Sequence, residues 1–148
     1  MNPVIKPDLA RIEAAPQMNL QKPLYLLLVL ISAATLVSGL VQIFAPGFIL
    51  GLIAAEITPS TMQGFGTIGM FMALFGGMLL HILLTRQNLP PVFLWAALQK
   101  IGAFVAVVIG VSHHLFGPLA LAIASFDLLS GILIFVYMKL VSNQRSLP

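Results

Sequence analysis

The chain has 148 residues, of which 59 % are hydrophobic and only 7 % charged, with a net charge of +3 and a mean hydropathy of +1.06. Soluble domains carry about 25 % charged residues, so the composition excludes an ordinary soluble protein and indicates an integral membrane protein. The basic residues form no stripe with interleaved aromatic residues, so nucleic acid is not an expected partner. Because cysteine is absent, disulfides, thiolate metal sites and thiol redox chemistry are excluded.

Residues 1–22 are polar, contain three prolines before the first apolar run, and are predicted to form a cytoplasmic tail. The first membrane span is predicted from Pro23 to Phe44, with small residues in its second half that would let a neighbouring helix approach closely. Residues 45–60 contain about a dozen apolar positions, too few to cross a bilayer, and predict an interfacial or re-entrant segment on the outer side. Glu56, near its end, is expected to be a solvated carboxylate.

The second span is predicted to begin at Thr58, which caps the helix, and Pro59, which suits the first helical position. It continues to about Leu84. Small residues at a four-residue spacing predict a helix-packing seam: Gly69, Ala73 and Gly77. His81 continues this spacing and is expected to point into the bundle near the inner surface. It would act there as a packing residue or as a catalytic or ligand-binding group.

The third span is predicted to begin at Pro91 and the fourth at Pro118, the latter ending at Leu140, so that residues 23–140 form the bundle and 141–148 a second cytoplasmic tail. A second packing seam is expected on the third span: Gly102, Ala106 and Gly110. The adjacent His113 and His114 lie at its outer end. They are either interfacial polar residues or, since histidine titrates near neutral pH, a proton entry group.

The third and fourth spans each carry one charge. Lys100 lies nine residues after Pro91, and Asp127 nine residues after Pro118. At 1.5 Å per residue each charge is roughly 13 Å deep, measured from opposite faces. The hydrocarbon core is about 30 Å thick, so both charges fall near the midplane. Because the connection between these spans is short, the helices should be antiparallel neighbours, and a buried contact between Lys100 and Asp127 is predicted.

Three interpretations of these charges remain open. A bare charge at the bilayer centre costs at least ~3 kcal/mol, and a Lys100–Asp127 pair that offsets this cost would fix helix register as a purely structural element. The pair could instead handle protons or bind a substrate, with His81 or His114 assisting. In the third interpretation Lys100 snorkels to the inner surface and never meets Asp127. Ser130, three residues after Asp127, is placed to hydrogen-bond to it.

The distribution of basic residues predicts the orientation. Lys and Arg precede the first span, lie between spans two and three, and follow span four, whereas residues 45–61 and 112–117 contain neither. The positive-inside rule therefore predicts four crossings with both termini in the cytoplasm. The two halves show no inverted repeat, so the duplicated broken helices of secondary transporters are not supported.

The predicted fold is thus an all-α integral membrane four-helix bundle. Its layout from Tyr25 to Leu140 resembles the small bacterial DoxX-like membrane proteins and related four-helix families of unknown function. The matching segments are Gly76-Gly77 with His81, residues 95–100, and Ser125-Phe126-Asp127. The resemblance implies a fold and a bacterial inner-membrane location more than an activity.

Three functions are compatible with these features. The first is a non-enzymatic accessory or scaffold subunit, because two packing seams exceed what one bundle needs. The second is a lipid-phase small-molecule binding protein or enzyme that uses Lys100 and Asp127, since buried charged groups suit acid–base work. The third is a proton-coupled carrier. No cofactor or metal is expected, and the expected partners are membrane lipids and other membrane subunits or further copies of the chain.

Overall fold

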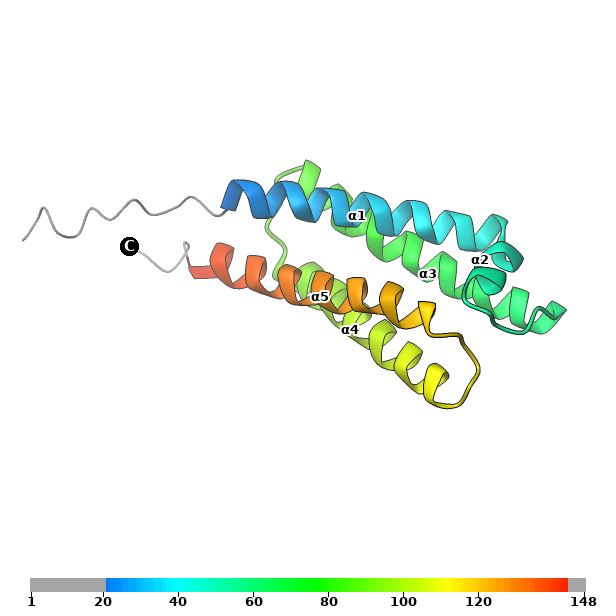
Figure 1. Ribbon diagram of the computed structural model, residues 1–148. Helices are drawn as coiled ribbons and strands as arrows, with labels where there is room; N and C mark the ends of the chain where they lie inside the picture. Colours follow the sequence, from blue (N-terminus) through cyan, green and yellow to red (C-terminus); the bar gives the residue numbers. More distant parts are fainter. Residues whose placement is uncertain (1–20, 144–148) are drawn as a thin grey trace, which may run out of the picture.

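The computed structural model describes residues 21–143, and over this range the chain is helical with no strand. Four long helices alternate in direction and a short helix follows the first (Figure 1). All four long helices are long and apolar enough to cross a membrane, which confirms the predicted all-helical chain with four membrane-length segments. The helices are α1 (Gln21–Phe44), α2 (Pro46–Leu52), α3 (Pro59–Leu84), α4 (Pro90–Ser112) and α5 (Leu119–Asn143).

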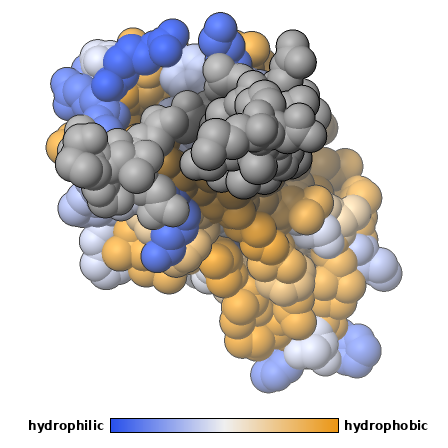
Figure 2. All heavy atoms as spheres, turned by 90° about the vertical axis from the view of Figure 1, so that its left-hand side faces the viewer, coloured by the Kyte–Doolittle hydropathy of each residue, from blue (hydrophilic) through white to orange (hydrophobic). Residues whose placement is uncertain are grey.

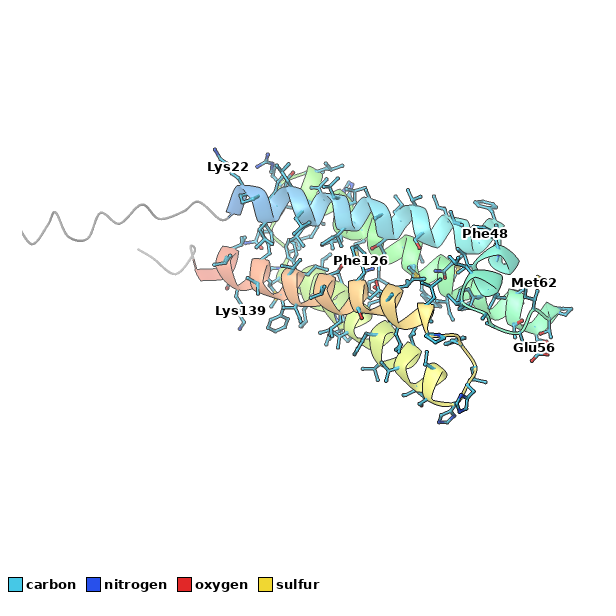
Figure 3. The ribbon with its side chains drawn as sticks, viewed as in Figure 1. Lys22, Phe48, Glu56, Met62, Phe126 and Lys139 are labelled. Atoms are coloured by element: carbon cyan, nitrogen blue, oxygen red, sulfur yellow. The ribbon has the colours of Figure 1, made fainter. Side chains whose placement is uncertain are left out.

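Both ends of the described chain lie at one end of the bundle, which we call the terminal end; α2 lies at the opposite end, the α2 end (Figure 1). Lys22 and Lys139 are at the terminal end, whereas Phe48 and Glu56 are at the α2 end (Figure 3). The predicted tail of residues 1–22 lies almost wholly outside the described residues. The second tail was predicted from residue 141, but α5 continues to Asn143.

The start of α3 follows the local chemistry of the sequence. The Thr58 hydroxyl accepts from the Thr61 N–H at 3.2 Å, and the Thr61 hydroxyl accepts from the Thr58 N–H at 2.8 Å. This reciprocal capping satisfies two backbone donors that the helix itself leaves free. Pro59 follows at the first helical position. The predicted start of the second span is confirmed, and α4 begins at Pro90, one residue earlier than predicted.

Three helices end on a left-handed residue that is not glycine. The φ angles of Ala54, Arg86 and His114 are 52°, 56° and 60°. At each, the next residue donates its N–H to a carbonyl five positions back, at 2.9 Å in all three cases. This is the Schellman closure, usually made with glycine because a Cβ is strained at positive φ.

Small residues bring α1 and α3 together at the first two positions of the predicted seam, Gly69 and Ala73, which both lie against Gly39, but not at the third, Gly77. Gly69 packs on the backbone of Gly39, and Gly76 packs so closely on α1 that an added Cβ would lie 2.7 Å from the Leu36 nitrogen. An added Cβ on Gly77 would meet only the Leu36 side chain, at 3.7 Å. A spacing of four drifts by about 40° per step around a helix with 3.6 residues per turn. The contact therefore passes from Gly69 to Gly76 rather than Gly77.

The predicted seam on α4 does not pack against another helix of the described chain. Gly102 and Ala106 are exposed, and a Cβ added to Gly102 would meet nothing within 4 Å. Gly110 packs against the Phe116 ring in the following connector, not against a helix. The close contact between α4 and α5 is supplied instead by Gly131, where an added Cβ would lie 3.1 Å from the Ala97 oxygen.

The buried core occupies the half of the bundle near the terminal end. Its members come from all four long helices: Leu28, Ile31, Leu79, Ile82, Leu83, Phe93, Ala96, Ala97 and Ile134. Many large apolar side chains lie on the outside instead, with Leu30 67 % and Trp95 60 % exposed. Figure 2, seen from the terminal end, shows hydrophobic side chains over much of the surface coloured in that view. Such an exterior suits a lipid environment, because soluble monomers rarely expose large contiguous apolar patches.

Candidate functional site

The structure brings the two intramembrane charges together. The Lys100 Nζ donates to the Asp127 Oδ1 at 2.6 Å, and the two side chains are 5 % and 14 % exposed. Lys100 is near the middle of α4, and Asp127 is on the adjacent turn of the antiparallel α5. Each charge thus offsets much of the cost of placing the other in an apolar environment. Lys100 does not extend to a membrane surface, so the snorkelling interpretation is wrong for this structure.

Neighbouring residues on α5 hold the lysine in place. Gly131 leaves room for the lysine stem, because an added Cβ would lie 3.3 Å from the Lys100 Cβ. The Phe126 ring centroid is 5.8 Å from the Lys100 Nζ, which permits a cation–π attraction. The expectation for Ser130 is wrong: its hydroxyl donates to the Phe126 carbonyl oxygen at 2.7 Å rather than to Asp127. Serine in a helix readily bonds the carbonyl four residues back.

A cavity of about 400 Å³ extends from the ion pair toward the α2 end. It lies between the α1–α3 pair and the α4–α5 pair, which diverge toward that end (Figure 1). Most of its wall is aliphatic or aromatic, including Phe65, Met72 and Phe116. Lys100 and Asp127 both line it, so the charged contact is accessible from the cavity rather than enclosed by side chains on every side.

The α1 wall of this cavity is polar. Thr35 donates its hydroxyl to the Ile31 carbonyl oxygen at 2.8 Å. Ser38 lines the cavity one turn further along. Gln42 follows and is only 8 % exposed. Its Nε2 donates to the Met72 sulfur at 3.3 Å, whereas its Oε1 is buried without a hydrogen-bond partner among the described residues.

Sequence reasoning missed this polar wall. The signal was available: Thr35, Ser38 and Gln42 follow spacings of three and four, which put them on one face of a helix. A polar stripe on an otherwise apolar membrane helix indicates a face that avoids lipid.

Space on the other side of the ion pair is far smaller. The cavity between Lys100 and the core near the terminal end is about 10 Å³, which is at the lower limit for one water molecule. Within residues 21–143, the pair therefore separates a close-packed half of the bundle from a hollow half.

The two connectors at the α2 end touch beside the cavity. The Gly117 N–H donates to the Ile53 carbonyl oxygen at 2.7 Å. A Cβ added to Gly117 would lie 3.1 Å from the Ala54 Cβ, so glycine permits this close approach. Ile53 and Phe116 both line the cavity. The contact thereby links the connector after α2 to the connector after α4 at the cavity's outer end.

The histidine candidates lie away from the cavity. His81 is exposed, contrary to the expectation that it points into the bundle. Twelve residues separate it from Gly69, a rotation of about 120° from the packed face. His114 is exposed in the turn after α4, whose end at Ser112 is roughly 18 Å along the axis from Lys100. Neither histidine lines the cavity, so the structure does not bring them to the ion pair.

The remaining acidic and histidine side chains of the described residues form no further candidate site. Glu56 is exposed at the α2 end, as expected of a solvated carboxylate. No group of three or more histidine or acidic side chains among the described residues is arranged to hold a metal ion.

Comparison with known proteins adds no assignment. No family model matches the chain, and no curated protein or solved structure matches it. The fold therefore defines a class only: a helical protein with four helices suited to crossing a membrane.

Proposed function

We propose that the chain is an integral membrane protein that binds a small lipid-phase molecule in the cavity beside Lys100 and Asp127. The observation that carries the proposal is a cavity of about 400 Å³ whose deep end is formed by this ion pair. Binding pockets for small molecules are typically about 300–1,000 Å³, mostly apolar, with few convergent polar groups. This cavity has that size and composition.

A purely structural role for the ion pair leaves the cavity unexplained. A pair that only fixes helix register is most favourable when close packing surrounds it, as it does on the terminal side of Lys100. Atoms that line an unfilled space lack packing contacts on that side. A bound molecule would restore those contacts, which supports binding rather than register alone.

The proposed orientation places the terminal end in the cytoplasm. Lys22 and Lys139 lie at that end (Figure 3), and Arg86 lies there too, over the Tyr25 ring near the start of α1. The segments joining the helices at the α2 end contain no Lys or Arg. This asymmetry is the pattern of the positive-inside rule. The apolar helix α2 then lies at the outer membrane interface.

The binding proposal is tested by filling the cavity. Ala103 lines it, so Ala103→Phe should displace a bound molecule. Val105 is 48 % exposed on the lipid side of the same helix, and Val105→Phe is the matched control. Native mass spectrometry of protein released from lipid nanodiscs should detect a bound small molecule with wild type and Val105→Phe but not with Ala103→Phe. Equal occupancy in all three proteins would contradict the proposal.

A second candidate function is the accessory or scaffold subunit. It is favoured by Gly102, a small residue left exposed on α4 outside the cavity lining, where another membrane helix could approach closely. Gly102→Leu tests it, because Gly102 lies outside the cavity lining. Loss of co-purifying membrane proteins, or of self-association, with the bound small molecule retained would support this second function. Unchanged association would contradict it.

A further inference from the structure

The cavity contains hydrogen-bonding groups that the protein does not pair. Asp127 accepts from Lys100 through Oδ1, and its Oδ2 has no hydrogen-bond partner among the described residues. Oδ2 is also not enclosed, because the only buried, unpartnered side-chain polar atom in residues 21–143 is the Gln42 Oε1. The cavity therefore presents an accessible carboxylate oxygen at its deep end. An acceptor in an apolar environment is costly to leave unpaired.

The orientation of the Gln42 amide is fixed by its neighbour. Its nitrogen is the atom near the Met72 sulfur, and a thioether sulfur only accepts hydrogen bonds. The opposite orientation would place two acceptors together. The unpaired atom is thus an oxygen, but neighbouring atoms enclose it, in a side chain that is only 8 % exposed. The acceptor that a ligand in the cavity can reach is therefore the Asp127 Oδ2.

Lys100 supplies the complementary donor. An ammonium group has three N–H donors, and Lys100 uses one of them on the Asp127 Oδ1. The deep end of the cavity therefore offers a donor and an acceptor side by side. A hydroxyl group satisfies both, because its oxygen accepts while its hydrogen is donated.

We propose that the ligand is a neutral, mostly hydrocarbon amphiphile whose hydroxyl group lies between the Lys100 Nζ and the Asp127 Oδ2, with its apolar part extending toward the α2 end. This inference rests on the proposed function and names the chemical class that the same cavity takes. Lys100 and Asp127 neutralise each other, so an anionic or cationic ligand would add an uncompensated charge inside the membrane. A hydroxyl adds none.

The cavity volume limits the size of the ligand. A volume of about 400 Å³ is near the lower end of the range of small-molecule pockets, about 300–1,000 Å³, so it suits a small ligand. A single-chain alcohol of about twelve carbons, or a ring compound of similar volume, matches this size. A two-chain phospholipid is far larger, so the cavity could enclose at most part of one.

Quenching by brominated probes tests the head-group preference. Phe65 lines the cavity, and Phe65→Trp in a Trp95→Phe background places the sole tryptophan there. The native Trp95 is 60 % exposed and reports membrane partitioning alone in the otherwise unchanged chain. Full-length protein in phosphatidylcholine nanodiscs is titrated with three probes: 12-bromododecan-1-ol, 1-bromododecane and 12-bromododecanoic acid. Quenching of the introduced tryptophan is corrected by quenching of Trp95.

The inference predicts that the alcohol quenches the introduced tryptophan at a membrane concentration about ten-fold or more below that of the alkane and the acid, as expected of hydrogen bonds to charged groups. The double variant Lys100→Met/Asp127→Leu, which leaves no unpaired charge, should lose this preference while still binding the alkane. A preference that persists in the double variant would overturn the placement of the hydroxyl.

Two further outcomes separate this inference from the proposed function. If all three probes bind the cavity equally, and Ala103→Phe abolishes their binding, the hydroxyl preference is refuted and the binding function stands. If no probe quenches the introduced tryptophan beyond the Trp95 reference, and native mass spectrometry detects no bound molecule, the hydroxyl preference and the binding function are both refuted.

Discussion

Gly39 of α1 and Gly69 of α3 each lie against the backbone of the other. A Cβ on Gly39 would be 2.6 Å from the Gly69 oxygen, and a Cβ on Gly69 would be 2.7 Å from the Gly39 oxygen. Because lipid tails are as apolar as the helices, close backbone packing of this kind contributes much of the affinity between membrane helices. The contact also positions the cavity wall, because a Cβ added to Gly69 would lie only 2.6 Å from the Cβ of Gln42, which lines the cavity.

Gly69→Ala should therefore destabilise the protein. The added methyl group forces α1 and α3 apart, at a cost of about 1–3 kcal/mol for overpacking. The measurement is the midpoint of unfolding by SDS in mixed micelles. Gly102→Ala is the matched control, because a Cβ there meets nothing within 4 Å, and its stability should be unchanged or slightly higher. Equal losses at both positions would show that α1 and α3 do not pack as described.

Breaking the ion pair should cost more than removing it. Lys100→Met leaves Asp127 as an uncompensated charge and should lower stability by about 3–5 kcal/mol. The Asp127→Leu change should do the same to Lys100. The double variant Lys100→Met/Asp127→Leu leaves no unpaired charge. Its loss of unfolding free energy should therefore be smaller than the sum of the losses in the two single variants. A double-mutant cycle measured by SDS unfolding checks this, and strictly additive losses would contradict a direct interaction.

The depth of the two charges could be derived from sequence because it depends on few quantities. The helical rise is constant, proline marks the start of a span, and a short connector makes neighbouring helices antiparallel. The structure moves the start of α4 by one residue, to Pro90, and this shift is too small to separate Lys100 from Asp127.

The cavity could not be derived in this way. Its volume depends on how the α1–α3 and α4–α5 pairs diverge, which follows from side-chain packing between residues distant in sequence. The packing seams were predicted only in part for a related reason: a four-residue spacing identifies small residues but not which of them remain on the contact face after two or three turns. Gly69 makes its close contact with α1 as predicted, whereas Gly76 and Gly131, which lie outside the predicted seams, make further close contacts that were not predicted.

His114 is expected to be dispensable for binding and unfavourable for stability. It has φ 60°, where a Cβ costs roughly 1–2 kcal/mol relative to glycine. His114→Gly should therefore raise stability by up to about 1 kcal/mol in SDS unfolding, with ligand occupancy unchanged. His113 has φ −92°, so His113→Gly should give no such gain. Reduced ligand occupancy in His114→Gly would instead support a functional role for this histidine.

The proposed orientation can be measured directly because the chain has no native cysteine. Glu56 is exposed at the α2 end, and Gln87 is exposed in the loop between α3 and α4 at the terminal end. In spheroplasts of bacterial cells, a membrane-impermeant maleimide should label Glu56→Cys but not Gln87→Cys. Both should be labelled after detergent lysis, which controls for reactivity. Labelling of Gln87→Cys alone in intact spheroplasts would invert the topology and place α2 and the cavity nearer the cytoplasm.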